Sequence, residues 1–180
     1  MKSVMLSIQP KWVEKIVTGK KTIEVRKSRP KIETPFKCYI YETKGQYIKF
    51  IHGAHTKYGY GCGKVIGDFV CDWITEITPS CDIDGCVNKY IHGYPAILGD
   101  CDCLSFDEMK AYLVNKKGYD WHISNLKIYD KPKELSEFIK PCTMMFKYCE
   151  ECEFYSTHTG CCTNFVTRPP ESWCYVEELK

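Results

Sequence analysis

The chain has 180 residues, of which 44% are hydrophobic and 27% are charged, so it can bury one substantial core and is not a disordered chain. No segment approaches the roughly 18 consecutive apolar residues that a membrane span needs, which excludes a membrane-spanning protein. The formal net charge is only +2, so any binding of nucleic acid must come from a local cluster of cations.

The first half of the chain is predicted to form strands around one helix. A strand is expected over 3–8, and a helix from Pro10 to about Thr18 follows it, because proline suits the first helical turn and apolar residues recur at helical spacing. Gly19 is a natural end for that helix. Further strands are predicted over 22–26 and 37–41, a long exposed loop over 44–60, and one long alternating strand over 63–77.

The second half begins with residues 80–103, which are rich in glycine and are predicted to be a loop. Ser105 and Glu108 form a capping box for a helix over about 106–115. A strand is predicted over 121–129, a turn with a short helical piece over 131–138, and a last strand over 173–178. This order of elements predicts an α+β fold in which a mixed, mostly antiparallel β-barrel carries flanking helices.

The most informative motif is Gly19-x-Lys21-x-x-Glu24-x-Arg26. Residues two apart on a strand share a face, so Glu24 and Arg26 are expected to project together, and Lys21 can reach them from the preceding turn. Arg26 is suited to binding a phosphate, and Lys21 or Glu24 to transferring a proton. The alternative is an ion-pair ladder on an ordinary exposed strand.

This motif and its surroundings resemble the ASCH domain family, whose pattern G-x-K-x-x-E-x-R it matches completely. The helix that begins Gln9-Pro-Lys-Trp, the segment Trp121-His-Ile-Ser and the segment Lys131-Pro-Lys-Glu-Leu-Ser-Glu-Phe also look like ASCH. The ending Thr167-Arg-Pro-Pro-Glu-Ser-Trp-Cys-Tyr-Val-Glu177 is similar to ASCH proteins of bacteria and their phages. The resemblance divides the chain into an ASCH domain over 1–140 and a cysteine-rich segment over 141–180 that ends in a strand packed on the barrel.

The resemblance implies a PUA-like barrel with a cleft beside the Lys-Glu-Arg strand that binds RNA or a modified nucleoside or nucleotide. One branch of the family hydrolyses N4-acetylcytidine with a Lys, a Thr three residues later and a downstream Glu. Lys21 matches the first of these, but Glu24 stands at the Thr position, and Asp100 and Asp102 match the third only loosely. An amidohydrolase that uses Lys21, Glu24 and Asp102 is therefore the alternative hypothesis, and RNA cleavage is another activity in the family.

Cations and aromatic residues around the motif extend the predicted binding surface. Lys20, Arg26 and Lys27 belong to the densest basic run and are expected to contact phosphates. Trp121 is the aromatic residue most expected to stack on a base, because the adjacent Trp121-His122 pair resembles the cleft-facing strand of the family. The alternatives are a solvated basic surface, a core tryptophan and a histidine satisfied within the fold.

Thirteen cysteines are many for a chain that is expected to be cytoplasmic. The apolar run after Met1 is soon interrupted by Gln9, Lys11 and Glu14, so it does not read as a secretory signal. Cytoplasmic thiols stay reduced, and a high cysteine count there favours metal binding over disulfides.

The segment from Pro141 to Val166 is predicted to bind a structural Zn²⁺ ion. Cys149-x-x-Cys152 is the spacing at which one tight turn directs two thiolates at one ion. The other ligands are expected among Cys142, His158, Cys161, Cys162 and Cys174. The alternatives are a set of reduced buried thiols, or a protein-interaction module in which the zinc-bound tail docks a protein partner.

Overall fold

The computed structural model describes residues 3–50, 56–93, 101–141 and 165–178. Its elements, in chain order, are β1 (Ser3–Ile8), α1 (Pro10–Val17), β2 (Ile23–Arg26), β3 (Phe36–Glu42), β4 (Gly45–Phe50), β5 (Thr56–Gly61), β6 (Val65–Cys71), β7 (Ile74–Cys81), β8 (Val87–His92), α2 (Phe106–Leu113), β9 (Gly118–His122), β10 (Ser124–Lys133), a 3₁₀ turn η2 (Leu135–Glu137), β11 (Phe138–Ile139) and β12 (Trp173–Glu178).

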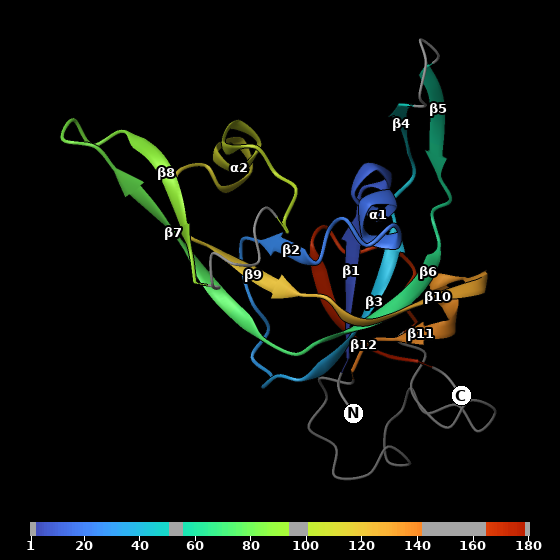
Figure 1. Ribbon diagram of the computed structural model, residues 1–180. Helices are drawn as coiled ribbons and strands as arrows, with labels where there is room; N and C mark the ends of the chain where they lie inside the picture. The colour runs from blue at the N-terminus through green and yellow to red at the C-terminus, as the bar shows by residue number, and fades with distance from the viewer. Residues whose placement is uncertain (1–2, 51–55, 94–100, 142–164, 179–180) are drawn as a thin grey trace.

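Two curved sheets form the body of the protein (Figure 1). The larger sheet has the order β10-β6-β3-β1-β12-β11, and the smaller has the order β2-β9-β7-β8. Among the described strands of the larger sheet, only β1 and β3 pair in parallel, since the chain passes through α1 and β2 between them. The predicted α+β class and the mostly antiparallel, barrel-like architecture are thus confirmed.

A shared apolar core joins the two sheets. It contains buried residues from both of them, among which are Leu6 of β1, Ile40 of β3, Phe69 of β6 and Trp121 of β9. The first strand, Ser-Val-Met-Leu-Ser-Ile, is apolar almost throughout because it lies in the middle of the larger sheet. A smaller apolar cluster packs α2 against one face of the four-stranded sheet.

Two predicted strands are each divided in the structure. The stretch 63–77 forms β6 in the larger sheet and β7 in the smaller one, and the stretch 121–129 is split at Ile123 between β9 and β10. The two breaks lie side by side, since the amide of His122 donates to the carbonyl of Trp73 at 3.2 Å. Both chain segments therefore turn from one sheet into the other at the same corner of the barrel.

Two predicted loops contain strands instead. Residues 44–60, predicted to be an exposed loop, contain the hairpin strands β4 and β5, which extend away from the barrel (Figure 1). The ring of Tyr47 lies over Gly59, where any Cβ atom would come within 2.3 Å of it. Residues 80–103 contain β8, which pairs with β7. Both segments are rich in turn-forming and polar residues, so their sequences did not indicate strands. Each strand is established by its pairing with the neighbouring strand of the hairpin.

The helices and the turn that surround the Lys-Glu-Arg motif lie where they were predicted. Helix α1 begins at Pro10, and Gly19 follows it with a φ of +72°, which glycine adopts readily. Helix α2 begins with the predicted reciprocal hydrogen bonds between Ser105 and Glu108. The chain between α1 and β2 therefore turns tightly and delivers Lys21 next to the first residues of β2.

The last strand, β12, pairs with β1 on one side and β11 on the other. The predicted strand at the C-terminal end therefore packs within the larger sheet. The predicted zinc ligands Cys142, Cys149, Cys152, Cys161 and Cys162 lie outside the described residues. Among the residues that the structure describes, no helix is long and apolar enough to cross a membrane.

Candidate functional site

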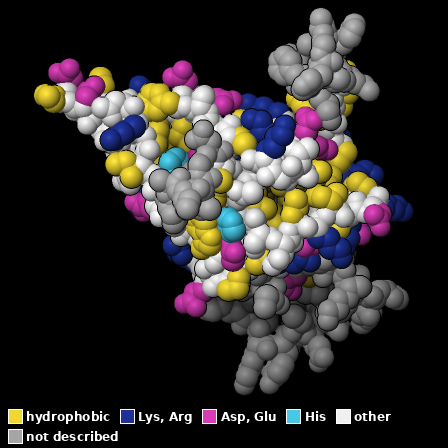
Figure 2. Space-filling view, in the orientation of Figure 1, with side chains coloured by type: hydrophobic (Ala, Val, Ile, Leu, Met, Phe, Trp, Pro, Cys, Tyr) yellow, Lys and Arg dark blue, Asp and Glu magenta, His cyan; other side chains and the backbone are white. Residues whose placement is uncertain are grey.

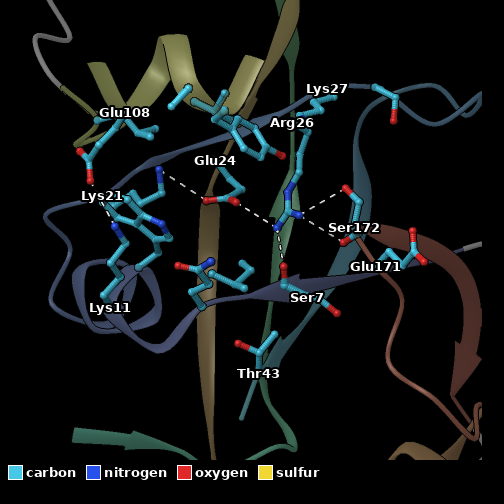
Figure 3. Close-up of a pocket in the computed structure, with 18 residues that line it drawn as sticks. Ser7, Lys11, Lys21, Glu24, Arg26, Lys27, Thr43, Glu108, Glu171 and Ser172 are labelled. Carbon is cyan, nitrogen blue, oxygen red and sulfur yellow. Dashed lines mark hydrogen bonds and ion pairs between the residues drawn. The ribbon is translucent and has the colours of Figure 1, made fainter. Parts of the chain in front are cut away.

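A cleft of about 800 Å³ lies between the two helices and β2 (Figure 3). Its lining comes from six parts of the chain: the end of β1, helix α1, the motif strand β2, Thr43 after β3, helix α2 and the segment before β12. The side chains that the structure places around it include Ser7, Lys11, Trp12, Lys21, Glu24, Arg26, Lys27, Thr43, Glu108, Tyr112, Glu171 and Ser172.

Lys21 and Glu24 form a buried ion pair in this cleft. The Lys21 Nζ atom lies 3.4 Å from Glu24 Oε2, and the two side chains are 1% and 8% exposed. The ammonium also donates to the main-chain oxygen of Asp102 at 2.5 Å. Glu24 Oε2 is buried and has no hydrogen-bond partner among the described residues. The pair therefore presents a carboxylate oxygen and an ammonium side by side to whatever enters the cleft.

Arg26 holds Glu24 in place from the other side (Figure 3). Its Nη2 atom lies 2.9 Å from Glu24 Oε1 and donates to the Ser7 carbonyl at 2.9 Å, while Nη1 donates to the Ser172 carbonyl at 3.2 Å. The guanidinium thus connects β2, β1 and the segment before β12. Both terminal nitrogens are already engaged, so Arg26 is arranged to position Glu24, and the expected direct contact of Arg26 with phosphate is not favoured by this geometry.

The carboxylate of Asp102 does not face Lys21. Its main-chain oxygen faces Lys21, whereas its carboxylate accepts from the amide of Leu104 at 2.8 Å and approaches His92 at 3.6 Å. Asp102 is not part of the cleft lining. A carboxylate turned away from the cleft cannot adjust the proton of Lys21 directly, so the arrangement expected of an amidohydrolase is not favoured.

Lysines lie at the mouth of the cleft, next to acidic side chains. Lys11 of α1 pairs with Glu108 of α2 at 3.1 Å, and both side chains are about half exposed. Lys27 lies at the far end of β2 with its ammonium 5.0 Å from the centre of the Tyr112 ring. The space-filling view shows lysine and arginine side chains gathered beside α1 (Figure 2). Lys20, also predicted to bind a ligand, is exposed and does not line the cleft.

The aromatic residues of the cleft are Trp12 and Tyr112. Trp12 is half-buried, and Lys11 lies 4.2 Å from the centre of its ring. Burial raises the pKa of Tyr112, so its phenol stays protonated and can donate a hydrogen bond. Both residues lie on faces of short helices, and nothing in their local sequence distinguishes them from core aromatics.

The two predicted contacts on the strand after α2 lie elsewhere. Trp121 is fully buried in the core, with its ring edge-on to Phe36 at 5.7 Å, so it is not accessible to a ligand. His122 stacks on Trp73 and pairs with Asp72 outside the cleft lining. Trp121 lies opposite Glu24 in the sheet register, so the two side chains project from the same face, where Trp121 is covered by Phe36 and Trp173.

A curved mixed barrel with a cleft between its flanking helices and one strand defines a PUA-like domain. The ASCH domain model matches residues 6–133, which is well over half of the chain, so the protein belongs to the ASCH domain family.

Solved structures support this assignment at the level of the fold. The ASCH protein of Zymomonas mobilis has a TM-score of 0.51 and 17% identity to this chain, and the match covers 97% of this chain and 87% of that one. Its single-substitution Tyr-to-Phe variant has a TM-score of 0.52 and 16% identity, covering 98% and 91%. No curated protein sequence matches this chain.

Proposed function

We propose that the cleft binds RNA or a modified nucleotide, with a base on the Lys21–Glu24 pair and phosphates at the lysines of the mouth. ASCH domains are generally associated with RNA binding. The observation that carries the proposal is the buried Glu24 Oε2 atom, which forms an ion pair with the Lys21 ammonium at 3.4 Å but lacks a hydrogen-bond partner among the described residues. A donor from a ligand would complete the hydrogen bonding of this buried oxygen.

The pair matches the edge of a nucleobase in chemistry. Bases carry donors and acceptors next to each other on their Watson–Crick edge, and proteins that read single-stranded RNA bind that edge directly. Cytosine, for example, offers its exocyclic amine to a carboxylate such as Glu24 and its ring nitrogen or carbonyl oxygen to an ammonium such as Lys21. The fixed position of Glu24, held by Arg26, prepares the carboxylate for such a ligand.

The mouth of the cleft supplies the remaining contacts. Lys11 and Lys27 can approach phosphate oxygens, and Trp12 offers a flat face for stacking. Glu108 and Glu171 also line the cleft, so it is not a purely cationic groove. A mixed lining favours recognition of one or a few nucleotides over indiscriminate binding of a polyanion.

Replacement of Lys21 by Ala, or of Glu24 by Ala, is expected to weaken the binding of short RNAs by about 1–3 kcal/mol, or roughly 5- to 150-fold in Kd. Each variant removes one partner of the base edge and leaves the other unpaired. Fluorescence anisotropy with labelled oligonucleotides and a panel of nucleosides measures the effect. Binding of the parent protein should also weaken as salt is raised.

The matched control is Lys117→Ala, which removes an exposed lysine paired with Glu76 outside the cleft lining. This variant should bind as the parent does. Equal affinity of the parent and the Lys21→Ala variant would contradict the proposal. Turnover of N4-acetylcytidine in the same samples, lost with Lys21→Ala, would establish the amidohydrolase in its place.

We also propose that the cysteine-rich segment binds one structural Zn²⁺ ion. The support is the Cys149-x-x-Cys152 spacing, together with further thiols at Cys142, Cys161 and Cys162. Cys174 is the weakest of the expected ligands, because burial raises the pKa of its thiol and zinc binds the thiolate.

The purified protein is expected to contain about one zinc ion per chain, and a Cys149→Ser, Cys152→Ser double variant to contain much less. Metal binding of this kind contributes on the order of ten kcal/mol of folding free energy, so the variant should also unfold at a lower temperature. Elemental analysis measures the zinc, and Cys81→Ser, at an exposed cysteine of β7, is the control. Zinc far below one equivalent in a metal-replete preparation would remove the proposal.

A further inference from the structure

A second polar cluster lies on the other face of the four-stranded sheet from the Lys21–Glu24 pair. It consists of His92 at the end of β8, Asp120 in the middle of β9, and Asp102 before α2. Asp120 is opposite Val25 in the register, and Glu24, the neighbour of Val25, projects from the opposite face of β2. One ligand atom from each of the three residues lies within 4.8 Å of the others.

The cluster is buried and carries more negative charge than its histidine can balance. Asp120 is 0% exposed and Asp102 is 4% exposed, while the His92 side chain is 21% exposed. A protonated His92 neutralises only one of the two carboxylates. Metal binding requires a neutral His92, which leaves two buried cations, Lys21 and Arg26, beside the three carboxylates of Glu24, Asp102 and Asp120. An unbalanced buried charge of this kind is disfavoured unless a bound cation neutralises it.

An independent observation indicates that a ligand is missing from the cluster. The Oδ1 atom of Asp120 is buried and has no hydrogen-bond partner among the described residues. A cation bound in the cluster carries water ligands, and one of these can donate a hydrogen bond to the free Oδ1 atom.

The arrangement of the atoms matches a carboxylate–histidine–metal unit. His92 Nδ1 lies 2.8 Å from Asp120 Oδ2, and His92 Nε2 lies 3.6 Å from Asp102 Oδ2. A histidine that donates one ring N–H to a carboxylate presents the other nitrogen to a metal ion. Two ligands at about 2.1 Å from one ion are roughly 3.0–3.4 Å apart, so a small adjustment brings Nε2 and Oδ2 to that separation.

We propose that His92, Asp102 and Asp120 bind one divalent cation of the first transition row. His92 Nε2 and Asp102 Oδ2 are the ligands, Asp120 orients His92 and supplies the second negative charge, and water completes the coordination. An imidazole nitrogen, a carboxylate oxygen and water ligands suit Mn²⁺, whereas the thiolates of the cysteine-rich segment favour Zn²⁺. The site is separate from both the cleft and the expected zinc ligands.

The cation would also stabilise the floor of the cleft. The main-chain oxygen of Asp102 accepts the hydrogen bond of Lys21 Nζ, so a metal bound to the Asp102 carboxylate fixes the backbone that holds Lys21. The same segment pairs with β2, because the Cys101 carbonyl accepts from the amides of Thr22 and Ile23. The role of the cation is therefore structural.

Titration of the zinc-loaded full chain with Mn²⁺, followed by electron paramagnetic resonance, tests the site. The parent is expected to bind about one Mn²⁺ per chain, and Asp120→Asn and His92→Gln are expected to bind at least about tenfold more weakly. The matched control is His122→Ala, which removes the exposed His122–Asp72 pair and should leave Mn²⁺ binding unchanged. No binding by the parent, or equal binding by all variants, would overturn the proposal.

A second measurement needs no variant and so is independent of any loss of folding. Bound Mn²⁺ broadens the nuclear magnetic resonance signals of nearby protons. Substoichiometric Mn²⁺ is expected to broaden the imidazole signals of His92 strongly and those of His122 weakly. Equal broadening of the two histidines, or broadening of neither, would show that the ion does not occupy this cluster.

Discussion

Replacement of Arg26 by Ala is expected to lower the free energy of unfolding by about 3–5 kcal/mol. Its guanidinium is 6% exposed and contacts the Glu24 carboxylate and the carbonyls of Ser7 and Ser172. Removing it leaves a buried carboxylate with only Lys21 as a partner and two carbonyls without their donors. Small domains are stable by only about 5–15 kcal/mol, so this loss is a large part of the total.

Urea unfolding followed by tryptophan fluorescence measures the effect. Arg26→Lys should recover only part of the loss, because one ammonium cannot reproduce the planar fork that reaches three acceptors on different segments. Arg29→Ala, at an exposed arginine three residues away, is the control and should change stability by less than about 0.5 kcal/mol. A loss below about 1 kcal/mol for Arg26→Ala would mean that the contacts around Glu24 do not hold the cleft together.

The elements that could be predicted from sequence are those specified by nearby residues. Pro10 and Gly19 mark the ends of α1, and Ser105 with Glu108 specifies the start of α2. The division of 63–77 could not be predicted, because the alternating pattern continues through Asp72 without interruption. In 121–129 the apolar positions change phase after Ile123, which does not by itself say that the strand changes sheets. Which sheet each half joins depends on pairing between segments about fifty residues apart.

The same distinction, between what nearby residues specify and what distant contacts decide, applies to the candidate site. Glu24 and Arg26 were predicted to share one face by the period of a strand, and Lys21 to reach them from the preceding turn, and the structure brings the three together. Ser172 lies 146 residues from Arg26, and no local pattern connects the two. Asp102 was expected to face Lys21 with its carboxylate, but the backbone turns that group toward His92. Contacts of this kind form between distant segments of the folded chain, so no periodic pattern in the sequence predicts them.

Composition also could not distinguish core aromatics from those that line the cleft. Trp121 belongs to a buried β-strand and Trp12 lies half-buried on a short helix, yet both are tryptophans beside polar residues. The cluster of His92 and Asp120 was missed for a related reason. Its members come from two strands that are twenty-eight residues apart, one of which was predicted to be a loop.

Trp121 and Trp12 are expected to respond in opposite ways to substitution. Trp121→Ala should destabilise the protein by about 3–5 kcal/mol, because the side chain is fully buried against Phe36 and Trp173. Trp121→Phe should cost less, since the indole N–H has no hydrogen-bond partner among the described residues and none is lost.

Trp12→Leu should leave stability nearly unchanged, because leucine keeps the apolar packing of α1, but it removes the flat face that lines the cleft. RNA binding should then weaken by about 1–3 kcal/mol. Urea unfolding and fluorescence anisotropy on the same samples separate the two effects. A Trp121→Ala variant that stays stable but no longer binds RNA would restore Trp121 as a ligand contact, and a Trp12→Leu variant with parental affinity would remove Trp12 from the binding surface.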